Sequence, residues 1–173
     1  MSTAPANGST RLVGLAPVVD AQVRCLILGS FPSPASLAAQ QYYGHKQNQF
    51  WRLLGATLAE PLLALPYPER LVRMCAHGIG LWDVYQSCIR PGALDANIRA
   101  GTANDFAALI PCLPQLARLC FNGQTAARFA SRFAVFGLAT VTLPSSSPAC
   151  TWPFAEKLKH WQAGIGQPAG NPV

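Results

Sequence analysis

VRCLILGSFPS, residues 23–33, is an apolar run that stops at Gly29 and continues into a loop of serine and proline. A run of Val, Leu and Ile without polar alternation is typical of a strand buried on both faces of a sheet. Val23–Leu28 is therefore the first predicted strand. Three similar runs predict strands at Ile79–Trp82, Leu116–Phe121 and Leu138–Leu143.

Helix-like segments separate and follow these strands. They span Gln47–Leu58, Pro68–Cys75, Asn104–Leu113, Gln124–Phe133 and Trp152–Gln162. Strands that alternate with helices indicate an α/β fold, in which helices cover both faces of a parallel sheet. The small, weakly periodic residues 1–20 and 164–173 are expected to be flexible tails. Residues 21–163 then form a single domain.

Composition excludes several classes of protein. The chain has 173 residues, of which 50% are apolar and 12% are charged, so we expect a folded core rather than disorder. Its seven acidic residues are scattered singly, which does not suit a two-metal hydrolase. No apolar run reaches the length of a membrane span. The net charge of +6 weakly favours a polyanionic partner.

Cysteine usage points to a reducing compartment. The six cysteines form no Cys-x-x-Cys pair, and several lie in apolar runs. We therefore expect reduced, mostly buried thiols, a cytoplasmic location and no bound metal. The N-terminus lacks the pattern of a secretory signal. Lys157 and Lys159 are expected on the solvated face of the last helix.

The loops after the predicted strands are the candidate site, because ligands of open α/β sheets bind at the carboxyl ends of the strands. Each loop also has a purely structural interpretation. The serines after Gly29 and Pro144 could cap helices, Asn48 could cap the helix that follows it, and Asp83 could bond to loop amides. The loops alone leave both interpretations open.

Taken in order, six pieces of sequence resemble the uracil DNA glycosylase superfamily, most closely its hypoxanthine branch. They are Leu28-Gly29-Ser30-Phe31-Pro32-Ser33, Tyr42-Tyr43-Gly44-His45 with Asn48-Gln49-Phe50-Trp51-Arg52, Gly80-Leu81-Trp82-Asp83-Val84, Gly92-Ala93-Leu94-Asp95, Phe121-Asn122-Gly123 and Leu143-Pro144-Ser145-Ser146-Ser147-Pro148-Ala149. The resemblance implies a three-layer α/β/α sandwich with a central four-stranded parallel sheet. It also implies a monofunctional DNA glycosylase that flips out a deaminated base and hydrolyses its N-glycosidic bond without a cofactor.

The resemblance assigns roles to individual residues. Asn48 is the candidate that positions the attacking water, Tyr43 stacks on the flipped base, and Asp83 reads the edge of the base. The loop that grips phosphates and wedges the duplex consists of Ser145, Ser146, Ser147, Pro148 and Ala149. Phe31 stands where other branches carry an Asp or Asn, a departure that fits the hypoxanthine branch. Leu143 stands where they often carry a His, which is another departure from uracil-type chemistry.

Chemistry supports these assignments. A carboxylate at Asp83 could accept a hydrogen bond from N1–H of hypoxanthine, and backbone amides near Ser30 and Phe31 could take up charge on the leaving base. Phe31 could also help to sandwich the purine. Lys46 is expected to contact a phosphate of the DNA rather than to act as a nucleophile. The expected partner is DNA containing a deaminated base, bound by a monomer, with no membrane contact.

Three alternatives remain open from the sequence. The chain could be a mismatch-directed uracil or xanthine DNA glycosylase. It could be an esterase-like hydrolase with Ser30 or Ser33 as nucleophile, although it has no Gly-x-Ser-x-Gly motif. It could also be a nucleic-acid-binding module without catalysis.

Overall fold

A computed structural model describes residues 10–166, and its centre is a parallel sheet with strand order β3-β2-β6-β7. The strands are β2 (Cys25–Gly29), β3 (Ile79–Asp83), β6 (Arg118–Asn122) and β7 (Ala139–Leu143). All four lie where the apolar runs predicted them. Side chains on β2 alternate between two cores: Ile27 faces one core and Leu26 and Leu28 face the other, and all three are fully buried.

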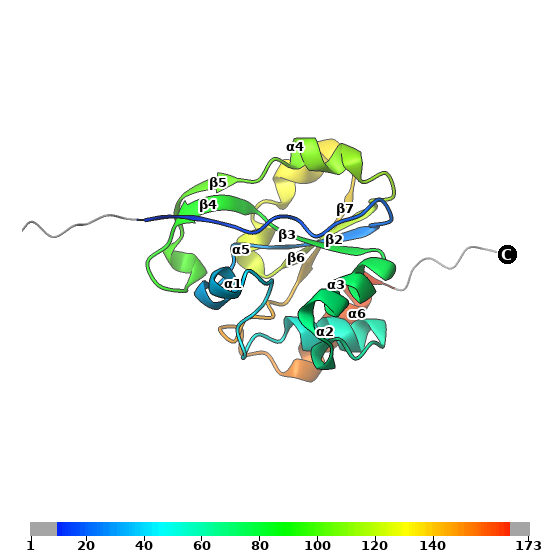
Figure 1. The fold of residues 1–173 in the computed structure, drawn as a ribbon. Helices are drawn as coiled ribbons and strands as arrows, with labels where there is room; N and C mark the ends of the chain where they lie inside the picture. The colour runs from blue at the N-terminus through cyan, green and yellow to red at the C-terminus, as the bar shows by residue number, and fades with distance from the viewer. Residues whose placement is uncertain (1–9, 167–173) are drawn as a thin grey trace, which may run out of the picture.

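Helices cover both faces of this sheet (Figure 1). The first face packs against α2 (Phe50–Leu58), α3 (Tyr67–Ala76) and α6 (Phe154–Ile165). The second face packs against α4 (Phe106–Leu109), α5 (Gln124–Ala127) and the 3-10 segment η4 (Ala130–Phe136). The predicted α/β/α sandwich is therefore confirmed.

Some helices differ from the sequence-based expectation. The predicted Asn104–Leu113 helix is α4 followed by the 3-10 turn η3 (Ile110–Cys112), since Pro111 cannot supply the amide that an α-helix needs there. Gln124–Phe133 is likewise divided between α5 and η4. The short helix α1 (Pro34–Ala39) was not predicted. Two further 3-10 turns are η1 (Leu62–Ala64) and η2 (Asp95–Asn97).

A second, antiparallel sheet was also missed. Its strands are β1 (Arg11–Val13), β4 (Tyr85–Ile89) and β5 (Arg99–Ala103), in the order β1-β4-β5. The predicted tail up to residue 20 was therefore wrong for residues 11–13, and Val18 also pairs with Leu81 in an isolated bridge. Residues 164 and 165 belong to α6 rather than to a C-terminal tail. Residues 1–9 and 167–173 of the predicted tails lie outside the described residues.

The topology brings the ends of all four parallel strands to one edge. Gly29 is in register with Asp83, and Asn122 is in register with Leu143. After Asp83 the chain turns at Val84 and enters β4, so Asp83 lies where one sheet gives way to the other. The candidate loops therefore converge as predicted.

Candidate active site

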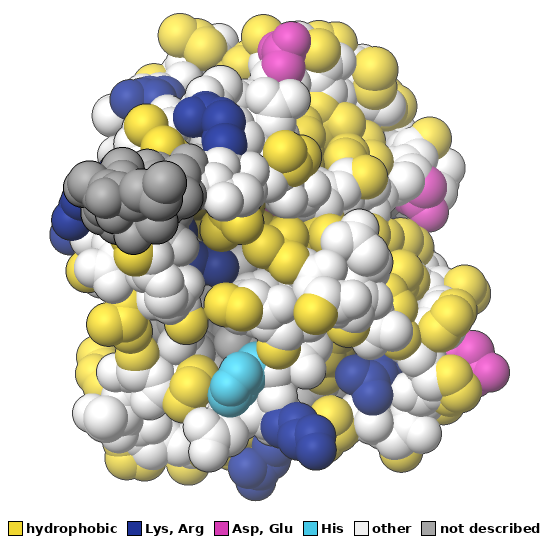
Figure 2. All heavy atoms as spheres, turned by 60° about the vertical axis from the view of Figure 1, so that its left-hand side comes forward, with side chains coloured by type: hydrophobic (Ala, Val, Ile, Leu, Met, Phe, Trp, Pro, Cys, Tyr) yellow, Lys and Arg dark blue, Asp and Glu magenta, His cyan; other side chains and the backbone are white. Residues whose placement is uncertain are grey.

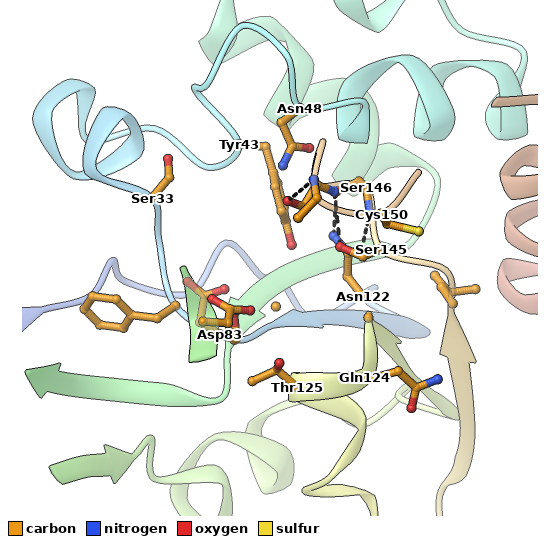
Figure 3. Close-up of a pocket in the computed structure, with 18 of the residues that line it drawn as sticks. Ser33, Tyr43, Asn48, Asp83, Asn122, Gln124, Thr125, Ser145, Ser146 and Cys150 are labelled. Carbon is orange, nitrogen blue, oxygen red and sulfur yellow. Dashed lines mark hydrogen bonds between the residues drawn. The ribbon is translucent and has the colours of Figure 1, made fainter. Parts of the chain in front are cut away.

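A pocket of about 710 Å³ lies at the carboxyl ends of the parallel strands. Figure 3 shows Tyr43 and Asn48 on one side of it, Asp83 and Thr125 across from them, and Asn122 beside Ser145, Ser146 and Cys150. On the molecular face drawn in Figure 2, acidic side chains lie toward the edges, whereas Lys and Arg side chains are spread over the face.

Gly29 leaves room for the polar groups at the bottom of the pocket. A Cβ atom on this residue would lie 2.5 Å from Oδ1 of Asp83 and 2.9 Å from the hydroxyl oxygen of Tyr43. Both distances are too short for a real contact, so a side chain at position 29 would displace one or both groups. Position 29 therefore requires glycine, because the two polar groups approach its backbone closely.

Asp83 is a buried carboxyl whose Oδ2 has no hydrogen-bond partner within the described part of the chain. Burial is the main reason that its pKa is raised from 3.8 to about 7; repulsion by Asp95 adds to the increase, and Arg90 opposes it. Near neutral pH, Asp83 is therefore present in both its acid and its carboxylate form. The sequence-based picture of a fully ionised acceptor is corrected accordingly.

Tyr43 lies between the core and the pocket. Its ring stacks on Phe50 with the centroids 3.8 Å apart, so one face of the ring is already covered. The backbone of Tyr43 has a φ of 54°, in the left-handed region. Burial raises the pKa of its hydroxyl, which stays protonated and has no hydrogen-bond partner among residues 10–166. The remaining ring face and this hydroxyl are the groups that Tyr43 can offer to a ligand.

Asn48 lines the pocket and also bonds to the start of the helix that follows it, although the N-cap position of that helix is Gln49. Its Oδ1 accepts a hydrogen bond of 2.9 Å from the amide of Phe50, the first residue of α2. A carbonyl oxygen has two lone pairs, so one remains for a further donor. The bond to the helix fixes the direction of this side chain.

The Ser145–Ala149 loop is held in place by Asn122, for which no individual role was predicted. The amide of Asn122 donates to Oγ of Ser146 and accepts from the backbone N–H of Ser146, each at 2.9 Å. Ser146 is buried, so its hydroxyl serves this clamp and does not face a ligand. Ser145 and Ser147 each accept from an amide two residues later, which leaves both hydroxyl protons available to donate.

Ser30 and Phe31 line the pocket but are largely engaged by neighbours. Oγ of Ser30 donates to Oδ2 of Asp95 at 2.6 Å. The Phe31 ring is only 6% exposed and lies under the guanidinium of Arg90, 5.3 Å from the ring centroid. Most of the ring is therefore unavailable for stacking. Arg90 itself is buried and its Nη2 has no partner among the described residues.

Among the other residues singled out in the sequence, Lys157 lies elsewhere than expected. Lys46 is exposed and does not line the pocket. Lys157 is only 1% exposed, so its predicted place on a solvated helix face was wrong, whereas Lys159 is exposed. Pro148 and Ala149 are exposed, and Ala149 lines the pocket. Trp152, not singled out before, also lines the pocket and is 50% exposed.

The geometry weakens the esterase alternative. The Ser30 hydroxyl donates to a carboxylate, and the Ser33 hydroxyl bonds to Ser36 while capping α1. Within residues 10–166 no serine is hydrogen-bonded to a histidine ring, as a serine nucleophile would require. The same residues contain no group of three or more His, Cys, Asp and Glu side chains that could hold a metal ion. None of their helices has the length and apolar character needed to cross a membrane.

Comparison with known proteins places the chain in a family. Residues 16–164 match the model of the uracil DNA glycosylase superfamily. The chain belongs to this superfamily. It is 38% identical over 150 residues to the hypoxanthine DNA glycosylase of Methanosarcina acetivorans, covering 87% of this chain and 95% of that protein. It is 39% identical over 136 residues to the hypoxanthine DNA glycosylase of Methanosarcina barkeri, covering 79% of this chain and 86% of that protein.

A solved structure of this superfamily has the same fold. The solution NMR structure of a candidate uracil DNA glycosylase from Methanosarcina acetivorans matches with a TM-score of 0.80 at 35% sequence identity. The match covers 91% of this chain and 100% of that chain.

Proposed function

We propose that this protein is a DNA glycosylase that removes hypoxanthine from DNA by hydrolysing its N-glycosidic bond. Two relatives with 38% and 39% identity bear the name hypoxanthine DNA glycosylase. The observation in the structure that carries the proposal is the unpartnered, buried carboxyl of Asp83 in a pocket at the strand ends. We further propose that the protein acts as a monomer in the cytoplasm and needs no cofactor.

Asp83 is well suited to read the edge of hypoxanthine. This base presents an N1–H donor next to the O6 acceptor, and a neutral carboxyl presents an acceptor next to a donor. The raised pKa of Asp83, about 7, makes this neutral form available at physiological pH. A proton held at O6 would also stabilise negative charge as the base leaves, which an ionised carboxylate could not do.

Tyr43 and Arg90 complete the base-binding part of the proposal. The open face of the Tyr43 ring would stack on the purine, an interaction typically worth about 1–3 kcal/mol. The unpartnered Nη2 of Arg90 and the backbone at Ser30 and Phe31 supply further donors near the base. Buried donors that lack a partner in the free protein gain one when the base enters.

Asn48 is proposed to orient the water that attacks the sugar carbon. Breaking the glycosidic bond gives the sugar cationic, oxocarbenium-like character, so a strong base is not required. The amide of Asn48 is fixed by its bond to α2 and retains an acceptor site. No lysine lines the pocket among the described residues, which supports hydrolysis without a Schiff base and hence without lyase activity.

The loop after β7 is proposed to bind the DNA backbone and support the flipped state. The hydroxyl protons of Ser145 and Ser147, with the exposed Pro148 and Ala149, face the phosphate, and Lys46 contributes a charge further out. Ala149 is too small to fill the gap that a flipped base leaves. Trp152, half-exposed at the pocket, has the size and apolar surface for that role.

Uracil is a second candidate substrate because its N3–H and O4 repeat the donor–acceptor pattern that Asp83 would read. A panel of duplexes with a single hypoxanthine, xanthine or uracil, and adenine and guanine as controls, tests the proposal. We expect hypoxanthine to be released fastest and the normal bases to stay in place. Faster release of uracil would transfer the assignment to uracil, and release of no base would leave only a DNA-binding role.

A further inference from the structure

Lys157 is a buried cation in α6. Lys157 is 1% exposed, whereas the side chain of Lys159, two residues further on, is 71% exposed and pairs with Glu156 at 2.9 Å. Burial lowers the pKa of Lys157. Burying an ammonium group is costly unless an opposite charge compensates it. The surroundings of this amine therefore need an explanation.

The partners of Lys157 carry no charge. Its Nζ donates to Oε1 of Gln49 at 3.0 Å and to the backbone oxygen of Ser147 at 3.5 Å. The salt bridges found in residues 10–166 are Arg73–Glu60, His77–Glu60 and Lys159–Glu156, and none includes Lys157. Two neutral carbonyl oxygens hold the ammonium group without neutralising it. The ammonium group therefore keeps a net positive charge next to Gln49 and Ser147.

Both partners of Lys157 belong to segments that contain residues of the pocket. Ser147 belongs to the Ser145–Ala149 loop, and Gln49 follows Asn48 directly in the chain. The backbone N–H of Gln49 also donates to the backbone oxygen of Ser146 at 2.9 Å. Lys157 thus joins the start of α2 to the loop after β7 from the buried side, while the other side of that loop lines the pocket.

We infer that Lys157 is a positioning residue whose missing counter-charge is a DNA phosphate bound on the pocket side of the Ser145–Ala149 loop. This inference rests on the proposed function. The ammonium group holds the loop through Ser147 and at the same time supplies fixed positive charge beneath the phosphate. Since it is already desolvated and held by two bonds, little ordering is needed when DNA arrives.

Three variants test the inference. Lys157→Met removes the charge but keeps an apolar stem, which a buried site tolerates well. Gln49→Glu keeps Lys157 and its bond but gives it a carboxylate, so the charge is neutralised inside the protein. Lys159→Met removes an exposed lysine of the same helix and is the matched control. Thermal unfolding by circular dichroism shows which variants fold.

The measurement is the affinity for a duplex with a stable abasic-site analogue, at potassium chloride concentrations from low to physiological. Each phosphate that a protein charge neutralises contributes about 0.9 to the slope of log affinity against log salt. We expect Lys157→Met and Gln49→Glu each to reduce the slope by about 0.9, and Lys159→Met to leave it unchanged. Wild-type slopes in both variants, or an equal loss with Lys159→Met, would overturn the inference.

Hypoxanthine release by the wild type, measured in parallel, separates the two claims. If the wild type releases hypoxanthine but Lys157→Met and Gln49→Glu keep the wild-type salt dependence of affinity, the role of Lys157 fails and the proposed function stands. If both variants lower the salt slope as expected but the wild type releases no base, Lys157 supports DNA binding and the proposed function fails.

Discussion

Asp83→Asn replaces the buried carboxyl by an amide of the same shape. The folded protein raises the pKa of Asp83 from 3.8 to about 7, so between these values it holds a proton that the unfolded chain has released. The contribution of Asp83 to the free energy of unfolding of the wild type therefore falls as the pH rises from about 4 to about 7. The amide does not titrate, so the variant lacks this decline.

The size of the effect follows from the pKa difference. One pKa unit is worth about 1.4 kcal/mol, so a rise from 3.8 to about 7 corresponds to about 4 kcal/mol of lost stability above pH 7. We expect Asp83→Asn to match the wild type in stability near pH 4 and to exceed it by up to about 4 kcal/mol at pH 8. A functional carboxyl that costs stability is a familiar compromise in active sites.

Urea unfolding at pH 5, 6, 7 and 8 measures the difference, with Thr125→Ala as a non-titrating pocket control. A stability difference that does not change with pH, or that shrinks as the pH rises, would refute the reasoning.

Base excision by the same variant gives a second readout. An amide also offers an acceptor and a donor, so Asp83→Asn should keep hypoxanthine release and flatten its pH profile, while wild-type release falls about tenfold per pH unit above 7.

Four further substitutions test other parts of the site. Asn48→Ala should slow single-turnover excision about 10²–10³-fold with abasic-DNA affinity nearly unchanged; equal losses of both would contradict its role. Gly29→Ala should abolish base release in a folded protein, and full activity would show that the close approach is not needed. Asn122→Ala should lower stability by about 1–3 kcal/mol and weaken DNA binding; unchanged values of both would contradict the clamp. Trp152→Ala should slow excision from duplex more than from single-stranded DNA, and equal slowing would argue against a wedge.

The parallel sheet was predictable because its strands are buried on both faces. Such burial requires continuous apolar runs, and these are visible in the sequence at all four strands. The antiparallel sheet has no such mark. Its strands read RLV, YQSCI and RAGTA, and β1 pairs with β4 across more than 70 residues of chain. Only the folded chain shows that these short segments pair.

The site was predictable as a set of loops, but not as an electrostatic arrangement. The position of Asp83 at a strand end could be anticipated, whereas its protonation depends on burial and on Asp95 and Arg90, which later segments supply. Lys157 left a signal that was missed. It follows Phe154 by three residues and precedes Trp161 by four, a spacing that places it on the apolar face of the helix.

Release of the free base tests the central claim most directly. The wild-type protein, in excess over a duplex with a single deoxyinosine, is allowed one turnover, and free hypoxanthine is quantified by mass spectrometry alongside strand cleavage with and without alkali. We expect equal amounts of free hypoxanthine and of an abasic site that breaks only in alkali. A strand that stays intact after alkali, with no free base, would contradict the account.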